Sequence, residues 1–416
     1  MPTRASTSLI FKGLTSPFRG YGIPSTWGKV KSCGKKSAGG VGTACRLWYN
    51  HTMRNEILTT KTPLSDLPEP LLDWYRANAR DLPWRRTRDP YRIWVSEIML
   101  QQTRVAAVLG YYARFLEAFP SVEALAAAPE QQLMKLWEGL GYYSRARNLQ
   151  KAAGLVAERG SFPDTYAELL ALPGVGDYTA SAIASAAFGR REAAVDGNVL
   201  RVVTRLTDCH DDIADPKTKK AIRAQVQAVM PEAAEDIRIF NQATMELGAT
   251  VCVPNGPPKC EVCPAAGFCL GRLRGTAPVL PVKAAKKARR VEERTVLVLL
   301  RRGRAALHRR PGRGLLAGLW EFPNVDGALD EDAAAAAAAA WGLTVKAWRN
   351  KLAAKHIFTH VEWHMTGYTL EVEGDGPADF FWADAEALRE RAVPSAFARY
   401  YAEAMTELED VWNESN

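Results

Sequence analysis

Apolar residues recur at three- and four-residue spacing over most of the chain from residue 63 to about residue 270. This is the period of amphipathic helices. It is clearest over residues 67–79, 106–118, 130–138, 145–158, 216–230 and 233–250. Proline and glycine separate these segments, as at Pro173–Gly176. The pattern predicts an all-α domain over residues 63–270.

The pattern changes after residue 292. Short alternating or apolar runs, which are typical of strands, occur at Thr295–Leu300, Leu352–Phe358, Met365–Glu373 and Phe380–Trp382. An alanine-rich helical segment, Asp332–Trp341, lies between them. Residues 271–292 contain Gly, Pro and basic residues without a period. The sequence therefore predicts an α+β domain over 293–416, joined to the helical domain by a basic linker over 271–292.

Residues 1–55 are rich in Gly, Ser and basic residues and show no apolar period. They hold nine Lys or Arg residues and no Asp or Glu. This composition predicts a disordered basic tail, and a translation start placed too far upstream of Met53 would look the same. A mitochondrial presequence is also basic and poor in acids. We expect a cytoplasmic, nucleoid-associated protein, or a mitochondrial or nuclear one if the tail is a genuine presequence.

The net charge of +8 suggests a polyanionic partner, but most of it comes from the tail. Elsewhere, residues 283–310 are the concentrated basic segment, with 11 basic and 2 acidic residues. Any contact with a polyanion must therefore depend on local features. No apolar run approaches the ~20 residues of a membrane span, so no membrane association is predicted.

Four of the seven cysteines, Cys252, Cys260, Cys263 and Cys269, fall within eighteen residues. Such crowding predicts a metal site in a reducing compartment. Four thiolates in one loop can bind a zinc ion or an iron–sulfur cluster. Zinc sites more often pair two Cys-x2-Cys knuckles, and only one such pair occurs here, so the spacing favours a 4Fe-4S cluster. We interpret the isolated thiols as small buried or disordered residues: Cys33, Cys45 and Cys209.

The segment Leu172–Ser185, with sequence LPGVGDYTASAIAS, predicts a tight turn that opens a helix. Pro173 ends one helix, and Gly174 and Gly176 permit the turn. The free N–H groups at the start of the next helix can face a phosphate. Small residues then recur at every turn. A plain helical hairpin is the simpler alternative, but the combination resembles the helix–hairpin–helix that binds the DNA backbone.

The order of motifs SEIMLQQT, GLGYYSR, LPGVGDYTA, VDGNV, the cysteine loop and FTH resembles the MutY-type adenine DNA glycosylases of the endonuclease III superfamily. The resemblance covers about residues 63–416. The first gap in the cysteine loop is seven residues, where the family usually has six. The segment Pro254–Pro258 could absorb this difference.

Removal of a base requires an acid that protonates the leaving group and a group that stabilises an oxocarbenium-like sugar. Without the context of their motifs, Glu97 would be interpreted as a solvated helix residue and Asp196 as a turn residue or an N-cap. The resemblance implies that Glu97 protonates adenine at N7. It implies that Asp196 stabilises the cation or forms a transient adduct, with Asn198 and Tyr178 orienting it and the substrate. Tyr178 stands where bifunctional relatives carry a Schiff-base lysine, which implies a glycosylase without lyase activity.

The resemblance also implies DNA contacts. Gln102 and Thr103 correspond to residues that wedge into the duplex when adenine is flipped out. Tyr142 corresponds to a tyrosine stacked beside the lesion base, although a core position is the alternative. Phosphate and structural roles stay open for four arginines: Arg85, Arg92, Arg145 and Arg147.

Residues Leu316–Pro323 resemble the start of a Nudix sequence. Asp330–Asp332 is followed by eight alanines in place of the metal-binding glutamates, so no pyrophosphohydrolase activity is expected. The family's Phe-Ser-His motif for 8-oxoguanine corresponds here to Phe358, Thr359 and His360, and Thr keeps the hydroxyl. Zinc binding by His356, His360 and His364 is a less favoured alternative.

The resemblance thus implies a monomeric enzyme that excises adenine from 8-oxoguanine·A or G·A mispairs in duplex DNA and carries a 4Fe-4S cluster. An endonuclease III-like glycosylase/lyase acting on oxidised pyrimidines is the main alternative, and Tyr178 and the second domain argue against it. A non-catalytic lesion-binding protein is the other alternative, and the presence of both carboxylates argues against that.

Overall fold

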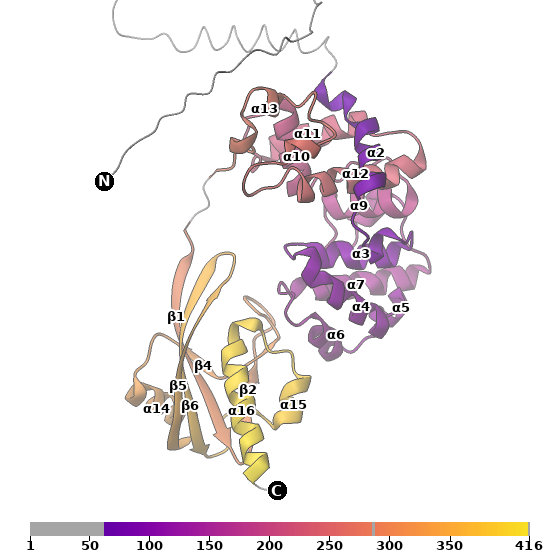
Figure 1. Cartoon of the computed structure of the whole chain (residues 1–416). Coiled ribbons are helices and arrows are strands. Elements are labelled where there is room, and N and C mark those ends of the chain that lie inside the picture. Colours follow the sequence, from indigo (N-terminus) through magenta and orange to yellow (C-terminus); the bar gives the residue numbers. More distant parts are fainter. Residues whose placement is uncertain (1–61, 285–287, 415–416) are drawn as a thin grey trace, which may run out of the picture. The chain divides into compact units, whose positions relative to one another are not determined.

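The structure, a computed structural model, describes residues 62–284 and 288–414. The predicted basic tail over residues 1–55 lies outside the described residues. A helical part extends to residue 284, and a part with a mixed sheet begins at residue 288 (Figure 1). The predicted fold class, an all-α domain followed by an α+β domain, is confirmed. In the described residues, no helix is both long and apolar enough to cross a membrane.

The predicted helical segments all form helices, with ends within two residues of the expected ones. The α-helices of this part are α2 (Pro68–Asn78), α3 (Pro90–Leu100), α4 (Val105–Ala118), α5 (Val122–Ala126), α6 (Glu130–Trp137), α7 (Ser144–Arg159), α8 (Tyr166–Leu170), α9 (Asp177–Phe188), α10 (Gly197–Thr207), α11 (Pro216–Val229), α12 (Ala234–Thr250) and α13 (Leu270–Leu273). The 3-10 turns are η1 (Pro63–Asp66), η2 (Pro83–Arg85), η3 (Cys260–Val262) and η4 (Ala277–Val279).

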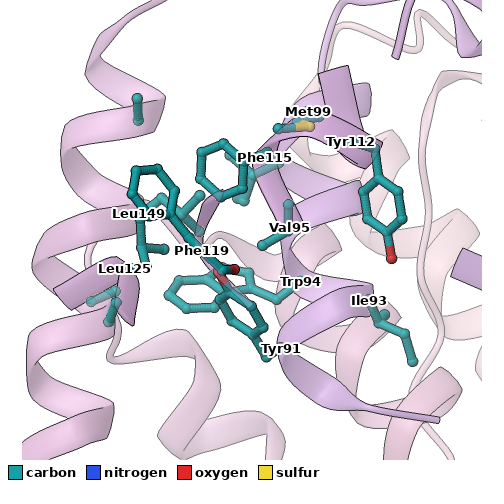
Figure 2. Close-up of a cluster of buried hydrophobic side chains, with 14 of the residues drawn as sticks. Tyr91, Ile93, Trp94, Val95, Met99, Tyr112, Phe115, Phe119, Leu125 and Leu149 are labelled. Carbon is teal, nitrogen blue, oxygen red and sulfur yellow. The ribbon is translucent and has the colours of Figure 1, made fainter. Parts of the chain in front are cut away.

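The helical part has two hydrophobic cores. The first is built by α3 to α9. Figure 2 shows aromatic residues in it, with Tyr91 and Trp94 of α3 near Phe115 of α4 and Phe119, which follows α4. The second is built by η1, α2 and α10 to α12, together with the apolar residues of the cysteine loop. Helix α9 contacts both α3 and α12, so it connects the two cores.

The predicted linker over 271–292 begins too early. Residues 270–282 include the short helices α13 and η4, and both Ala277 and Leu280 are buried. The side chain of Arg205 on α10 donates a hydrogen bond to the Leu280 carbonyl at 2.9 Å. The lack of periodicity misled the prediction because these turns are too short to show one.

The second part contains the strands β1 (Arg290–Arg301), β2 (Arg304–Arg309), β3 (Trp320–Glu321), β4 (Asn324–Asp326), β5 (Thr344–Ile357), β6 (Val361–Glu373) and β7 (Phe381–Ala383). Its helices are α14 (Glu331–Ala340), α15 (Ala385–Glu390), η5 (Ser395–Phe397) and α16 (Ala398–Glu414). The main strand order is β3-β2-β1-β6-β5, with β4 paired to β1 and β7 to β2. Strands β1 and β6 are parallel, and the other pairs are antiparallel.

Both faces of this sheet are covered, which explains the apolar run in β1. Val296 and Val298 pack with α16 on one face, while Leu297 and Leu299 pack with α14 on the other. Side chains alternate between the faces of a strand, so a central strand must be apolar at every position. The sheet ends in a β5–β6 hairpin whose tip carries residues 358–360.

Candidate active site

Glu97 lies on α3 and faces groups from other elements. Its Oε2 accepts a hydrogen bond from the Tyr178 hydroxyl at 2.8 Å. Burial raises the pKa of Glu97 to about 7, and the negative charge of Asp196 adds to this rise. The hydrogen bond from Tyr178 and the charge of Arg85 oppose it. A carboxyl with this pKa can hold a proton at neutral pH and give it to a leaving group.

Tyr178, in the first turn of α9, stays neutral beside Glu97. Its hydroxyl also contacts the Met245 sulfur on α12 at 3.2 Å. Burial, together with the charges of Glu97 and Asp196, raises the pKa of Tyr178 well above its usual value. The side chain can therefore orient Glu97, but it is no amine nucleophile for a Schiff base.

Asp196 is the N-cap of α10, and its charge also acts on Glu97. Its Oδ1 accepts hydrogen bonds from the backbone N–H groups of Asn198 at 2.9 Å and Val199 at 2.8 Å, at the start of α10. Its Oδ2 accepts one from Asn198 Nδ2 at 2.7 Å. Burial raises the pKa of Asp196, and these hydrogen bonds oppose the rise. The N-cap interpretation and the catalytic one therefore describe the same side chain.

Asn198 is held in turn by Arg201, which the sequence analysis missed. Arg201 Nη2 donates to Asn198 Oδ1 and to the Gly248 carbonyl, both at 2.8 Å. Arg201 Nε donates to the Cys252 carbonyl at 2.8 Å. One buried guanidinium thus links the partner of Asp196 to the start of the cysteine loop. The sequence signal that could have identified Arg201 is a pair of arginines one turn apart in α10, GNVLRVVTRLT.

The four cysteines of the loop line one small pocket with Arg205, Lys259 and Arg272. Arg205 Nη1 approaches the Cys252 sulfur at 3.3 Å, and cationic donors of this kind stabilise thiolates. Among the residues described, no three His, Cys, Asp or Glu side chains are arranged to hold a single metal ion. Four thiols gathered in one loop beside cationic side chains are a donor set of the kind that holds an iron–sulfur cluster.

Gln102 and Tyr142, which are predicted to contact DNA at the lesion pair, have an unusual backbone conformation. Gln102 has φ +60° and Tyr142 has φ +47°, and both are exposed. Non-glycine residues rarely adopt positive φ, and such strain is concentrated at functional sites. Thr103 follows Gln102 in the same turn and is partly buried. The structure thus places two strained, exposed side chains on the loops that follow α3 and precede α7.

Arg145 on α7 connects these two loops. Its Nη1 donates to the carbonyls of Ile98 at 2.7 Å and Gln101 at 2.6 Å, and its Nη2 donates to those of Leu140 at 2.9 Å and Gly141 at 3.1 Å. Burial lowers the pKa of Arg145 to about 10, which leaves it charged at neutral pH. Its role is structural and it is not a free phosphate contact.

We expect Arg145→Met to lower the free energy of unfolding by about 3 kcal/mol, because several carbonyls lose a charged donor. Chemical denaturation monitored by circular dichroism measures this. Arg159→Met is a matched control on the same helix, since Arg159 makes an exposed ion pair with Glu168. That control should cost less than about 1 kcal/mol. Equal losses in the two variants would contradict the structural role of Arg145.

The turn between α8 and α9 needs glycine at one of its two predicted positions. Gly174 has φ +77°, and an added Cβ would meet the Asn148 side chain at 2.7 Å. Gly176 has φ −102°, and no heavy atom lies near its missing Cβ. The two glycines expected to permit the turn thus differ: Gly174 has the positive φ that favours glycine, and Gly176 has a φ that any residue can adopt. Gly176 instead leaves open space at the N-cap of α9.

In the second part, the FTH motif forms the tip of the β5–β6 hairpin, and its three residues have different surroundings. The Phe358 ring packs edge-to-face on Trp363 at 4.8 Å. Thr359 and His360 are exposed. The alternative of a zinc site is not supported in the described residues: His356 packs on Phe358, and His364 hydrogen-bonds Glu362 at 2.7 Å. The hairpin thus presents a hydroxyl and an imidazole to solvent.

The segment that resembles a Nudix motif holds a carboxyl that is paired within the domain. The buried Glu321 pairs with Arg310 at 2.5 Å and with His308 at 3.1 Å. Helix α14 packs Ala334 and Ala338 against the sheet. The absence of hydrolase activity stays a prediction from the sequence.

The comparisons with known proteins match both parts. Residues 95–232 match the HhH-GPD superfamily of base excision DNA repair proteins, and residues 295–403 match the NUDIX domain. The Homo sapiens adenine DNA glycosylase is 35% identical over 402 residues, which covers 80% of this chain and 72% of that protein. The Rattus norvegicus adenine DNA glycosylase is 35% identical over 399 residues, which covers 80% of this chain and 76% of that protein. Among solved structures, a thermostable thymine-DNA glycosylase matches 51% of this chain and 97% of its own, with 30% identity and a TM-score of 0.46. The chain belongs to the adenine DNA glycosylase family.

Proposed function

We propose that this protein is a monomeric, monofunctional glycosylase that excises adenine mispaired with 8-oxoguanine or guanine from duplex DNA. The observation that carries the proposal is the cluster in which Tyr178 donates a hydrogen bond to the half-buried Glu97, with Asp196 close enough for its charge to raise the pKa of Glu97. Two carboxyls in one site titrate apart when their surroundings differ. Here Glu97 lies in the more apolar setting, and Asp196 accepts three hydrogen bonds.

In the proposed reaction the adenine nucleotide leaves the helical stack and binds at this cluster. Glu97 gives its proton to N7 as the C1′–N9 bond breaks, and the bonding electron pair leaves with the base. The carboxylate of Asp196 stabilises the positive charge that develops on the sugar. Water then adds to C1′ and loses a proton, which leaves an abasic site and an intact strand.

We further propose that Cys252, Cys260, Cys263 and Cys269 hold a 4Fe-4S cluster. When bound, the cluster would fix the loop between α12 and α13 and leave the excision chemistry to the carboxylates. Iron analysis of the purified protein tests this, with about four iron atoms per chain expected. One zinc per chain and little iron would contradict it.

A single-turnover excision assay on an 8-oxoguanine·A duplex tests the proposed function. We expect release of adenine, with strand breakage only after alkali. A G·A duplex and a thymine-glycol duplex serve as comparators. Cleavage of the thymine-glycol strand, or a protein–DNA adduct trapped by borohydride, would instead indicate an endonuclease III-like lyase.

The tip of the β5–β6 hairpin is proposed to read 8-oxoguanine. Replacing both Thr359 and His360, as Thr359→Val with His360→Ala, should reduce the ratio of the excision rates on 8-oxoguanine·A and G·A by about tenfold. His364→Ala is the control, because this exposed histidine lies on β6 and pairs with Glu362. An unchanged ratio in the double variant would remove the hairpin tip from lesion recognition.

A further inference from the structure

The basic segment over residues 283–310 has no place in the function described so far, and its charges do not form one surface. Four of its arginines pair with acidic side chains of the second part: Arg290, Arg294, Arg301 and Arg310. Arg289, directly before β1, differs from these four. It is exposed, and in the described part of the chain it forms no ion pair.

Arg289 is attached to the tip of the β5–β6 hairpin. Its Nε donates a hydrogen bond to the Phe358 carbonyl at 3.1 Å. The backbone N–H of the next residue, Arg290, donates to the His360 carbonyl at 3.2 Å. The chain at the start of β1 therefore binds the FTH motif at two of its three residues. The Arg289 guanidinium lies at the tip that presents the exposed side chains of Thr359 and His360.

The bond at Nε leaves the outer edge of this guanidinium open. Arginine has five N–H donors in a planar fork, and the four on Nη1 and Nη2 of Arg289 bind no other group within the described residues. Such a fork matches two oxygens of a phosphate, and the bond at Nε fixes its direction before a ligand binds. Two carboxylates of the neighbouring strands are already neutralised, since Glu292 pairs with Arg290 and Glu362 pairs with Lys355.

We propose that Arg289 binds a backbone phosphate of the DNA strand that carries 8-oxoguanine, and so fixes the hairpin tip in register with the lesion. The inference rests on the proposed role of Thr359 and His360 in reading that base, because the phosphates that flank a base belong to its own strand. Phosphate contacts position a protein on the duplex, whereas contacts to base edges distinguish the bases. Arg289 therefore adds affinity and leaves the discrimination between 8-oxoguanine and guanine to Thr359 and His360.

The experiment is a salt titration of duplex binding by wild type and Arg289→Gln, followed by fluorescence anisotropy. The duplexes carry 8-oxoguanine or guanine opposite 2′-fluoro-2′-deoxyadenosine, whose electron-withdrawing fluorine prevents excision. Loss of one phosphate contact should weaken binding to both duplexes equally, by about tenfold at low salt. A plot of the logarithm of the association constant against the logarithm of the salt concentration should become less steep by about 0.9.

Two further variants keep the test decisive. Arg289→Lys keeps the charge and loses the fork, so it should bind both duplexes more weakly and keep the wild-type salt slope. Arg304→Gln is the matched control, because Arg304 is another exposed arginine of the basic segment. It lies opposite Arg301 at the far end of the 12-residue strand β1. That distance is roughly 35 Å along the strand, so this variant should change neither the affinity nor the slope.

An unchanged salt slope in Arg289→Gln would overturn the proposal. A loss of affinity confined to the 8-oxoguanine duplex would also overturn it, because Arg289 would then contact the base or act only as a tether for the Phe358 carbonyl. A wild-type protein that releases no adenine from an 8-oxoguanine·A duplex would overturn the proposed function. Normal excision by the wild type, together with wild-type binding by Arg289→Gln, overturns this inference alone.

Discussion

Adenine release by Glu97→Gln is expected to be about 10³-fold slower than wild type under single-turnover conditions, because the amide cannot donate the proton that the leaving base needs. The amide oxygen can still accept the hydrogen bond from Tyr178, so the fold should survive. The pKa of about 7 also predicts the pH dependence of the wild type. The acid form is present below this pKa, so the rate should fall about tenfold per unit above it.

Quenched single-turnover assays over a range of pH measure both effects. Glu117→Gln is a suitable control, since this carboxyl lies exposed on the neighbouring helix α4. It should change neither the rate nor the profile. Excision by Glu97→Gln within tenfold of wild type, with the alkaline limb retained, would show that another group is the acid.

Much of the fold and the identity of the candidate site could be predicted from local sequence. The helical segments have a clear period, and the motifs around Glu97 and Asp196 have a fixed order. The contacts that tune the site could not be predicted in the same way. Arg201 lies 51 residues from Cys252 in sequence, and nothing local shows that its guanidinium is buried beside the cysteine loop.

Short turns and contacts to backbone atoms also could not be predicted from the sequence. The turns α13 and η4 are too short to display a period, so their buried residues were assigned to a linker. Gly174 and Gly176 look alike in the sequence, yet only Gly174 has a positive φ. The sequence left both a phosphate and a structural role open for Arg145, because its carbonyl partners are backbone atoms, which leave no side-chain signature.

Replacing Asp196 by Asn is expected to slow excision by about 10³-fold while costing only about 1 kcal/mol of stability. Asparagine is a good N-cap, so the Oδ1 contacts to the start of α10 can persist. The lost negative charge removes the stabilisation of the oxocarbenium-like sugar. The new amide N–H at position 196 would also face Asn198 Nδ2, which is itself a donor. Because Arg201 binds Asn198 Oδ1, the Asn198 amide cannot turn over, and one hydrogen bond is lost.

The matched control is Asp215→Asn. Asp215 caps α11 in the same manner, with its side chain accepting from the Lys217 N–H at 2.8 Å, but it is not among the groups that shift the pKa of Glu97. This variant should lose no more stability than Asp196→Asn and keep wild-type excision. Single-turnover rates and thermal unfolding of the two variants separate the charge of Asp196 from its capping role. If the two variants lose activity only in proportion to stability, Asp196 is a helix cap and the positive sugar must be stabilised by another group.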